Sequence, residues 1–139
     1  MEENNMDNCI FCKIANKEIP GKIIYEDDIC MAFMDLSQTT NGHTLVVPKK
    51  HFQNFLETDA KTLEHMIVVT NKVANQIVTK LNASGVNILT NVNEAAGQTV
   101  MHFHIHIIPR YDSNDKIEIN FTDRSKEVNL DDIFKQITE

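Results

Sequence analysis

The chain has 139 residues, of which 42% are hydrophobic and 24% are charged, a size and composition that predict a single globular domain over residues 1–139. Its formal net charge of −7 argues against broad nucleic-acid binding, which depends on clustered lysine and arginine. The apolar runs are too short to span a membrane, and the polar, acidic segment Met1–Asp7 is unlike a signal peptide, so a cytoplasmic protein without membrane contact is expected.

The N-terminal half of the chain predicts one short helix followed by strands. The helix is expected over residues 10–17 and ends before Pro20-Gly21. Three runs of strand-like composition follow, at residues 22–26, 29–34 and 44–47. Asp27-Asp28 separates the first two and suits a tight turn, so these two runs should form a hairpin.

A long helix dominates the rest of the chain. Between Asp59 and Leu81, apolar residues recur at helical spacing and provide one face to bury. A strand over residues 86–92, a loop, and a strand that contains three histidines come next. Asn129 then precedes two acidic residues and an apolar stripe, which predicts a short capped helix. Together these elements predict an α+β fold, a mostly antiparallel sheet with one long helix packed on it and short terminal helices.

The segment His102-Phe103-His104-Ile105-His106 carries the clearest functional signal. Successive side chains of a strand point to opposite faces, so the three imidazoles share one face and the apolar residues share the other. Because the apolar face needs burial, the histidines should line the open side of the sheet. Imidazoles removed from water need a hydrogen-bond partner or a metal, so this row predicts catalysis or metal binding rather than packing.

Residues 102–108 resemble the histidine triad (HIT) family pattern, His-x-His-x-His followed by two apolar residues. Residues 41–51 resemble the family segment that brings a fourth histidine to the site, and residues 32–35 resemble its nucleotide-binding hairpin. The resemblance covers residues 9–110 and leaves residues 111–139 as a C-terminal extension. It implies a homodimer that binds a purine nucleotide in each subunit and reacts at the α-phosphate through a nucleotidyl-histidine intermediate.

The resemblance assigns catalytic roles to His104, His106 and His43. His104 would attack phosphorus, since neutral imidazole is a competent nucleophile near its unperturbed pKa of about 6.5. His106 would interact with the phosphate or the leaving group, and His43 would belong to the proton network that serves the leaving group. Asp35 would accept hydrogen bonds from the two ribose hydroxyls, although an aspartate at a strand end could equally cap a turn.

The other nucleotide contacts are expected from one loop and one apolar slot. Gln98 and Thr99 offer an amide and a hydroxyl to the phosphate, and Asn93 corresponds to a family asparagine at this site, although an ordinary turn residue is as good an interpretation of Asn93. Five apolar residues are expected to form the slot that holds the base: Ile10, Phe11, Ile14, Phe33 and Leu36.

Three cysteines, an odd number, argue against a disulfide framework. A redox role for Cys9-x-x-Cys12 usually requires a preceding strand, which is not predicted here. The resemblance extends to the uridylyltransferase branch and to some bacterial family members, and there it implies a closed, structural zinc site formed by Cys9, Cys12, His51 and His102. The alternative is that both cysteines are reduced packing residues. Cys30 is expected in the core, and His65 is expected to face solvent.

The leading functional hypothesis is a nucleotide phosphoramidate hydrolase that acts on substrates such as adenosine monophosphoramidate. A dinucleoside polyphosphate hydrolase is the alternative that Pro109-Arg110 favours, and a nucleotidyl transferase fits less well in so small a chain. Two other classes remain open: a nucleotide-binding regulatory module with little activity, and a zinc-binding structural protein that uses the whole histidine row. Counting bound zinc and measuring AMP binding would separate these classes.

Overall fold

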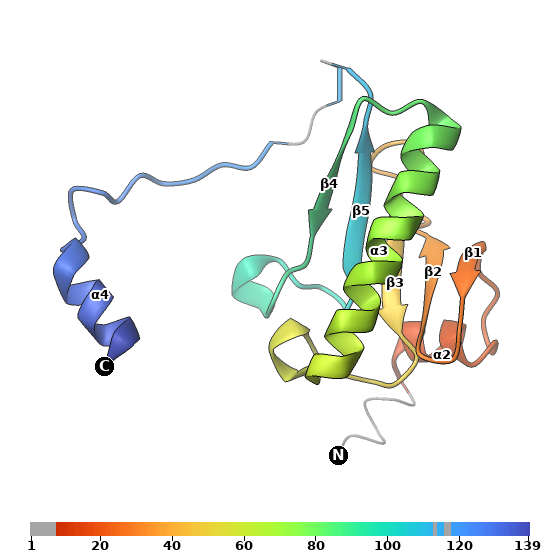
Figure 1. Cartoon of the computed structure of the whole chain (residues 1–139), viewed down its shortest axis with the longest axis horizontal. Helices are drawn as coiled ribbons and strands as arrows, with labels where there is room; N and C mark the ends of the chain where they lie inside the picture. Colours follow the sequence, from red (N-terminus) through yellow and green to blue (C-terminus); the bar gives the residue numbers. More distant parts are fainter. Residues whose placement is uncertain (1–7, 113, 116–117) are drawn as a thin grey trace.

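The computed structural model describes residues 8–112, 114–115 and 118–139, and the acidic segment Met1–Asp7 lies outside them. Five antiparallel strands form one sheet in the order β1-β2-β3-β5-β4. The strands are β1 (Ile23–Glu26), β2 (Cys30–Met34), β3 (Thr44–Pro48), β4 (Gly85–Leu89) and β5 (Ile105–Arg110). Helix α3 (Ala60–Leu81) lies across one face of the sheet and α2 (Ile10–Ala15) lies against the other (Figure 1). The predicted α+β fold is therefore confirmed.

Helix α3 begins and ends where its sequence predicts. The Asp59 side chain caps it by accepting a hydrogen bond from the Thr62 N–H at 3.3 Å, and Asn82 ends it in a left-handed conformation with φ of 57°. Its buried face packs on one face of the sheet, and each large apolar side chain buried there contributes about 1.5–3 kcal/mol. The residues buried in this layer of α3 are Met66, Val69, Val73, Ala74 and Ile77.

The β1–β2 hairpin is fastened to α3 through Asp27. One carboxylate oxygen accepts hydrogen bonds from the backbone N–H groups of Ile29 and Cys30 at 2.8 and 2.9 Å. The other lies 2.7 Å from the Tyr25 hydroxyl and 2.6 Å from His65 Nε2 on α3. Burial raises the pKa of Asp27, but these hydrogen bonds outweigh it and hold the pKa well below its usual range. The prediction that His65 faces solvent therefore holds only in part, because its side chain is 34% exposed but is bonded to the hairpin turn. The core position of Cys30 is confirmed.

The histidine segment has the predicted alternation but only part of it is a paired strand. Phe103, Ile105 and Ile107 all lie in the core beneath α3, as expected. Strand β5 starts at Ile105, three residues later than predicted, and β4 ends at Leu89 rather than at residue 92. The histidine face is also not open: His102 and His104 are 0% and 7% exposed. Helix α2 and its neighbouring residues cover this face, which the sequence pattern of the strand could not reveal.

Helix α4 (Leu130–Thr138) is present as predicted, with the Asn129 side chain accepting a hydrogen bond from the Asp132 N–H at 3.1 Å. It lies at the end of an extended segment, away from the sheet (Figure 1), and none of its residues is buried. No helix within the described residues is long and apolar enough to cross a membrane.

Candidate active site and metal centre

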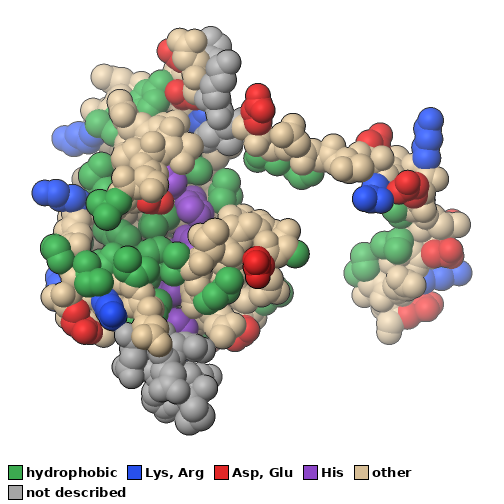
Figure 2. Space-filling model, turned by 180° about the vertical axis from the view of Figure 1, so that it is seen from behind, with side chains coloured by type: hydrophobic (Ala, Val, Ile, Leu, Met, Phe, Trp, Pro, Cys, Tyr) green, Lys and Arg blue, Asp and Glu red, His purple; other side chains and the backbone are tan. Residues whose placement is uncertain are grey.

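Two segments bring the catalytic candidates together on the α2 side of the sheet. The loop before β3 turns at Gly42, whose φ is 96°, and an added Cβ there would lie 2.6 Å from Leu81 of α3. Only glycine tolerates both the positive φ and the close approach of the Leu81 side chain. This tight turn sets His43 at the start of β3, where Leu45 pairs with His106 of the neighbouring strand β5. Figure 2 shows histidine side chains in a hollow beside a patch of hydrophobic side chains.

His104 has one ring nitrogen engaged and one available. Its Nδ1–H donates to the backbone carbonyl of His102 at 2.7 Å, which leaves the Nε2 lone pair for chemistry. The Phe11 ring packs edge-on against the imidazole with centroids 5.0 Å apart. Burial lowers the pKa of His104 and outweighs the opposing effects of this hydrogen bond and of Asp35. His104 is therefore held as a neutral imidazole in a fixed orientation, which is the form that can act as a nucleophile.

His106, His43 and Asp35 form a proton network beside His104. His43 Nε2 lies 2.9 Å from His106 Nδ1 and 3.6 Å from an Asp35 carboxylate oxygen. The other His43 nitrogen lies 3.3 Å from both the Thr39 N–H and the Ser37 carbonyl, so it can either accept or donate. Burial lowers the pKa of His106 to about 4, with neighbouring histidines acting in the same direction and Asp35 opposing them. His43 can thus change tautomer while it stays connected to His106, as a proton relay requires.

The residues predicted to hold the base line a cavity of about 390 Å³ that also reaches the catalytic candidates. All five predicted slot residues line it, together with Asp35, Thr99, His104 and His106. The residues that sequence reasoning missed come from three turns and from strands β2 and β3, and no local motif marks them. They are Ile19, Pro20, Gly21, Met34, Ser37, Leu45 and Val100. An apolar slot that ends at a carboxylate, a hydroxyl and two imidazoles suits a molecule with a flat base, a sugar and a phosphate.

Gln98, predicted as a phosphate ligand, and Asn93, predicted as a nucleotide contact, do not lie where these roles were expected to place them. The Gln98 side chain is 2% exposed and braces its own loop: Nε2 donates to the carbonyls of Gln53 and Val100 at 2.6 and 2.9 Å, and Oε1 accepts from the Asn93 N–H at 2.8 Å. Neither Gln98 nor Asn93 lines the slot cavity. The amide of Gln98 is committed to backbone groups, so among these loop residues Thr99 is the one that faces the cavity.

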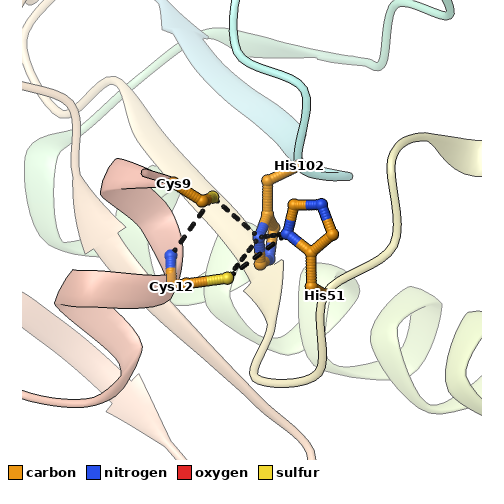
Figure 3. A group of neighbouring side chains, drawn as sticks. All are labelled: Cys9, Cys12, His51 and His102. Carbon is orange, nitrogen blue, oxygen red and sulfur yellow. Dashed lines mark hydrogen bonds between the residues drawn. The ribbon is translucent and has the colours of Figure 1, made fainter. Parts of the chain in front are cut away.

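Four side chains converge on a point at the N-terminus of α2, as Figure 3 shows: Cys9, Cys12, His51 and His102. Cys9 Sγ lies 3.3 Å from His102 Nδ1, and Cys12 Sγ lies 3.3 and 3.4 Å from Nδ1 of His51 and His102. The two Nδ1 atoms are 3.1 Å apart. In a tetrahedral Cys2His2 zinc site, bonds of about 2.0–2.3 Å place ligand atoms about 3.3–3.8 Å from one another. These four separations lie within a few tenths of an ångström of that geometry, and all four donor atoms lie within 4.8 Å of one another.

The surroundings of this cluster also fit a cation. His102 Nε2–H donates to the Pro48 carbonyl at 2.9 Å, which directs the Nδ1 lone pair into the cluster. Burial lowers the pKa of His102 to about 4, so its ring is neutral. Burial, together with Cys9, raises the pKa of the Cys12 thiol to about 12, and a bound cation would displace that proton. The donor set is thus oriented toward a thiophilic metal such as zinc.

His102 connects the two sites. Its ring nitrogen belongs to the cysteine-histidine cluster, while its backbone carbonyl accepts the hydrogen bond that orients His104. The orientation of the His104 ring therefore depends directly on the position of His102.

The pattern that defines the HIT domain family matches residues 16–113. The crystal structure of a HIT family protein from Bacillus anthracis is 42% identical, covers 95% of this chain and 94% of its own, and superposes with a TM-score of 0.87.

Two further relatives carry descriptive names. A protein named adenylylsulfatase HINT3 from Arabidopsis thaliana is 38% identical over 111 residues, which are 79% of this chain and 56% of that protein. A structure described as a zinc-bound histidine triad family protein from Mycobacterium smegmatis is 34% identical, covers 87% of this chain and 88% of its own, and has a TM-score of 0.77.

Proposed function

The chain belongs to the HIT domain family, and from that premise we propose that it is a nucleotide hydrolase that cleaves the bond between an α-phosphate and its leaving group. Nucleotide phosphoramidates such as adenosine monophosphoramidate are the proposed substrates. The observation that carries the proposal is the orientation of His104, whose Nδ1–H is held by the His102 carbonyl at 2.7 Å while its ring lines the slot cavity.

The proposed reaction has two displacements at phosphorus. In the first, the Nε2 lone pair of His104 forms a bond to the α-phosphorus as the bond to the leaving amine breaks, and the amine departs with a proton that the His43–His106 pair relays from solvent. In the second, a water molecule attacks the nucleotidyl-histidine, the bond between nitrogen and phosphorus breaks, and the water proton is relayed back to solvent through the same pair. Splitting one hydrolysis into two displacements lowers the barrier of each, and positioned proton transfer adds about 10²–10⁴-fold.

Substrate contacts follow from the residues that line the cavity. Phe11, Ile14 and Phe33 would hold the base, and Ile10 and Leu36 would cover it at the exposed rim. The Asp35 carboxylate would bind the ribose hydroxyls, and Thr99 would bind the phosphate. Gln98 and Asn93 would contribute by fixing the loop that presents Thr99, since the contacts of Gln98 run to that loop and to Gln53.

Other leaving groups are weaker candidates. Arg110, whose position after the triad favours dinucleoside polyphosphates, donates to the Asn87 side chain and the Asp115 carbonyl, each at 2.9 Å, and does not line the slot cavity. An adenylyl sulfate substrate is favoured by the name of the plant relative. Purified protein should be incubated with adenosine monophosphoramidate, adenylyl sulfate and diadenosine polyphosphates, and AMP release should be measured. Binding of AMP without turnover of any of these would instead indicate a regulatory module.

The rate of hydrolysis should depend on pH through His104. Because burial lowers the pKa of His104 in the folded protein, the ring stays neutral at pH values where a free imidazole, with a pKa of about 6.5, is half protonated. The acid limb of kcat/KM should therefore fall below pH 6.5, and the rate should change little between pH 7 and 8. A profile of kcat/KM from pH 4.5 to 8.5 tests this, because that ratio reports the free enzyme. A half-maximal rate above pH 6.5 would contradict a buried neutral nucleophile.

We also propose that the cysteine-histidine cluster binds one structural zinc ion through Cys9, Cys12, His51 and His102. The ligand spacing and the zinc-bound relative both support this assignment. No position would be left open for substrate, so the metal would stabilise the fold and fix the segment that leads to His104, and it would take no part in the reaction.

The chain is further proposed to form a two-fold symmetric dimer through α3 and β4. Strand β4 is an open edge of the sheet, and an apolar groove of about 400 Å³ lies between it and α3, lined by Ile67, Ala74, Val78, Val86 and Ile88 among others. An exposed edge beside an apolar groove is typical of a surface that pairs with another chain.

Light scattering at micromolar concentration is expected to give the mass of a dimer. Ile88 on β4 is 45% exposed and Ile29 at the opposite side of the sheet is 42% exposed, so they make a matched pair. Ile88→Lys should raise the dimer dissociation constant at least about tenfold, a cost of about 1.4 kcal/mol, whereas Ile29→Lys should leave it unchanged. A wild-type monomer, or equal effects of the two changes, would rule out this interface.

A further inference from the structure

The C-terminal arm, residues 118–139, presents an apolar surface that its own chain does not cover. In α4, one stripe of the helix is exposed: Leu130 by 80%, Ile133 by 41%, Phe134 by 65% and Ile137 by 78%. Their spacing places all four on one side of the helix. Figure 2 shows hydrophobic side chains along this arm, which stands apart from the rest of the molecule.

Helix α4 is too short to be stable by itself. It has nine residues, whereas isolated helices below about 12–15 residues are marginal in water even with favourable sequences. Its cap by Asn129 and its acidic first turn stabilise it only modestly. An amphipathic helix of this length forms because its apolar stripe is buried, and none of its residues is buried in a single copy of this chain.

The extended part of the arm adds to this surface. Ile119, Phe121 and Val128 are 60%, 86% and 44% exposed. A large apolar side chain presents on the order of 150–200 Å², so the seven exposed side chains of the arm offer several hundred Å². Monomers rarely expose a contiguous apolar patch larger than a few hundred Å², and two such arms buried reciprocally would approach the roughly 1,600 Å² of a standard stable interface.

The charges on α4 argue against a membrane as the partner. Its polar side carries Asp131, Asp132 and the terminal Glu139 against a single Lys135. Helices that bind membrane surfaces carry lysine and arginine there, because the lipid headgroups are anionic. The apolar stripe of α4 therefore fits an apolar protein surface.

A second copy of this chain fits that description and lies within reach. The arm follows β5, which is the neighbour of the open edge strand β4, so a copy seated on the α3–β4 groove would lie beside the departing arm. The Bacillus anthracis structure matches 95% of this chain, and such coverage includes most of the arm. The arm is thus largely included in the match to this solved relative.

We propose that the arms are exchanged in the dimer, so that α4 of each copy packs on the body of the other copy. This inference rests on the proposed dimer and goes beyond it, because the α3–β4 interface needs no arm. Exchange would convert two isolated short helices into buried ones and would make each folded arm depend on its partner.

Cross-linking of mixed isotopes tests whether the contact is between chains. Unlabelled and ¹⁵N-labelled full-length protein are mixed, unfolded and refolded together, and treated with a lysine-reactive cross-linker. Lys135 on α4 should be linked to lysines of the body. Some of these cross-linked peptide pairs should combine a ¹⁵N-labelled peptide with an unlabelled one, and others should carry a single isotope. Cross-links of Lys135 that are always of one isotope would show packing within a chain and would overturn the proposal, as would the absence of any such cross-link.

A pair of double variants tests whether the apolar stripe carries the contact. Phe134→Asp with Ile137→Asp should remove the protection of α4 amides in hydrogen–deuterium exchange and raise the dimer dissociation constant at least about tenfold. Lys135→Asp with Gln136→Asp adds the same number of acidic residues outside the stripe and should retain both properties. Equal behaviour of the two double variants, or unprotected α4 amides in the wild-type dimer, would overturn the proposal.

Hydrolysis measured on the same samples separates this inference from the proposed function. Inactive wild-type protein with exchanged arms would remove the enzyme assignment alone. Active protein whose Lys135 cross-links stay within one chain would remove the arm exchange alone.

Discussion

Replacing His104 with asparagine should lower turnover by about a thousandfold or more while nucleotide binding changes little. The substitution removes the lone pair proposed to attack phosphorus, and loss of a nucleophile affects the chemical step rather than the binding of base and sugar. Asparagine keeps a polar side chain in a position that is only 7% exposed and packed against Phe11. Turnover of adenosine monophosphoramidate and AMP affinity by calorimetry are the two measurements.

His65 provides the control for this substitution. It lies on α3 and bonds to Asp27, outside the slot cavity, so His65→Asn should leave turnover within about twofold. Rapid quenching followed by mass spectrometry should also detect wild-type protein heavier by one nucleotidyl group, and this species should be missing in His104→Asn. Turnover of His104→Asn within about tenfold of wild type would exclude His104 as the nucleophile, because even a lost proton transfer costs about 10²–10⁴-fold.

Removing one thiol of the metal cluster should release zinc and destabilise the fold. Wild-type protein purified without chelators should contain one zinc per chain, and Cys12→Ala should contain little, because three remaining donors no longer complete a tetrahedral set. The melting temperature should fall by roughly 10 °C, since each kcal/mol of lost stability corresponds to about 2–8 °C in a domain of this size. Zinc analysis and thermal unfolding measured on the same sample test both statements.

Cys30 is the matched control for the zinc experiment. It is fully buried but lies under α3, away from the cluster, so Cys30→Ala should keep one zinc per chain whatever it costs in packing. Zinc should also dissociate from the wild type as pH falls, because protons compete for the thiolates and for the imidazole of His102. Equal zinc content in Cys12→Ala and wild type, or wild-type protein without zinc, would return both cysteines to a packing role.

Zinc loss should also affect the catalytic site, because both sites contain His102. The carbonyl of His102 accepts the His104 Nδ1–H, and the ring of His102 belongs to the cluster. Loss of zinc should therefore loosen the segment that orients His104 and lower kcat modestly, without the near-complete loss expected from His104→Asn. The KM should also rise, because Cys9 and Cys12 belong to the segment of α2 whose Phe11 and Ile14 line the slot.

The sequence by itself determined the elements whose signals are local. The 22-residue helix α3 follows from its apolar spacing and from Asp59 at its start, because helix periodicity and capping act within a few residues. The assignment of Phe103, Ile105 and Ile107 to the core follows equally from alternation along one segment. The slot residues were also predictable, although only through resemblance, since no local rule distinguishes a slot residue such as Ile14 from an ordinary core residue.

Only the tertiary structure decided how distant segments meet. His102 and His104 are buried because α2 packs over them. The Gln98 amide nitrogen donates its hydrogen bonds to the Gln53 and Val100 carbonyls. His65 is bonded because the hairpin turn at Asp27 reaches α3. Each of these outcomes depends on which backbone or side-chain group satisfies a polar atom removed from water, and that partner lies far along the chain or in another element. Local patterns fix the elements and their faces, whereas burial and hydrogen-bond partners arise when the elements pack together.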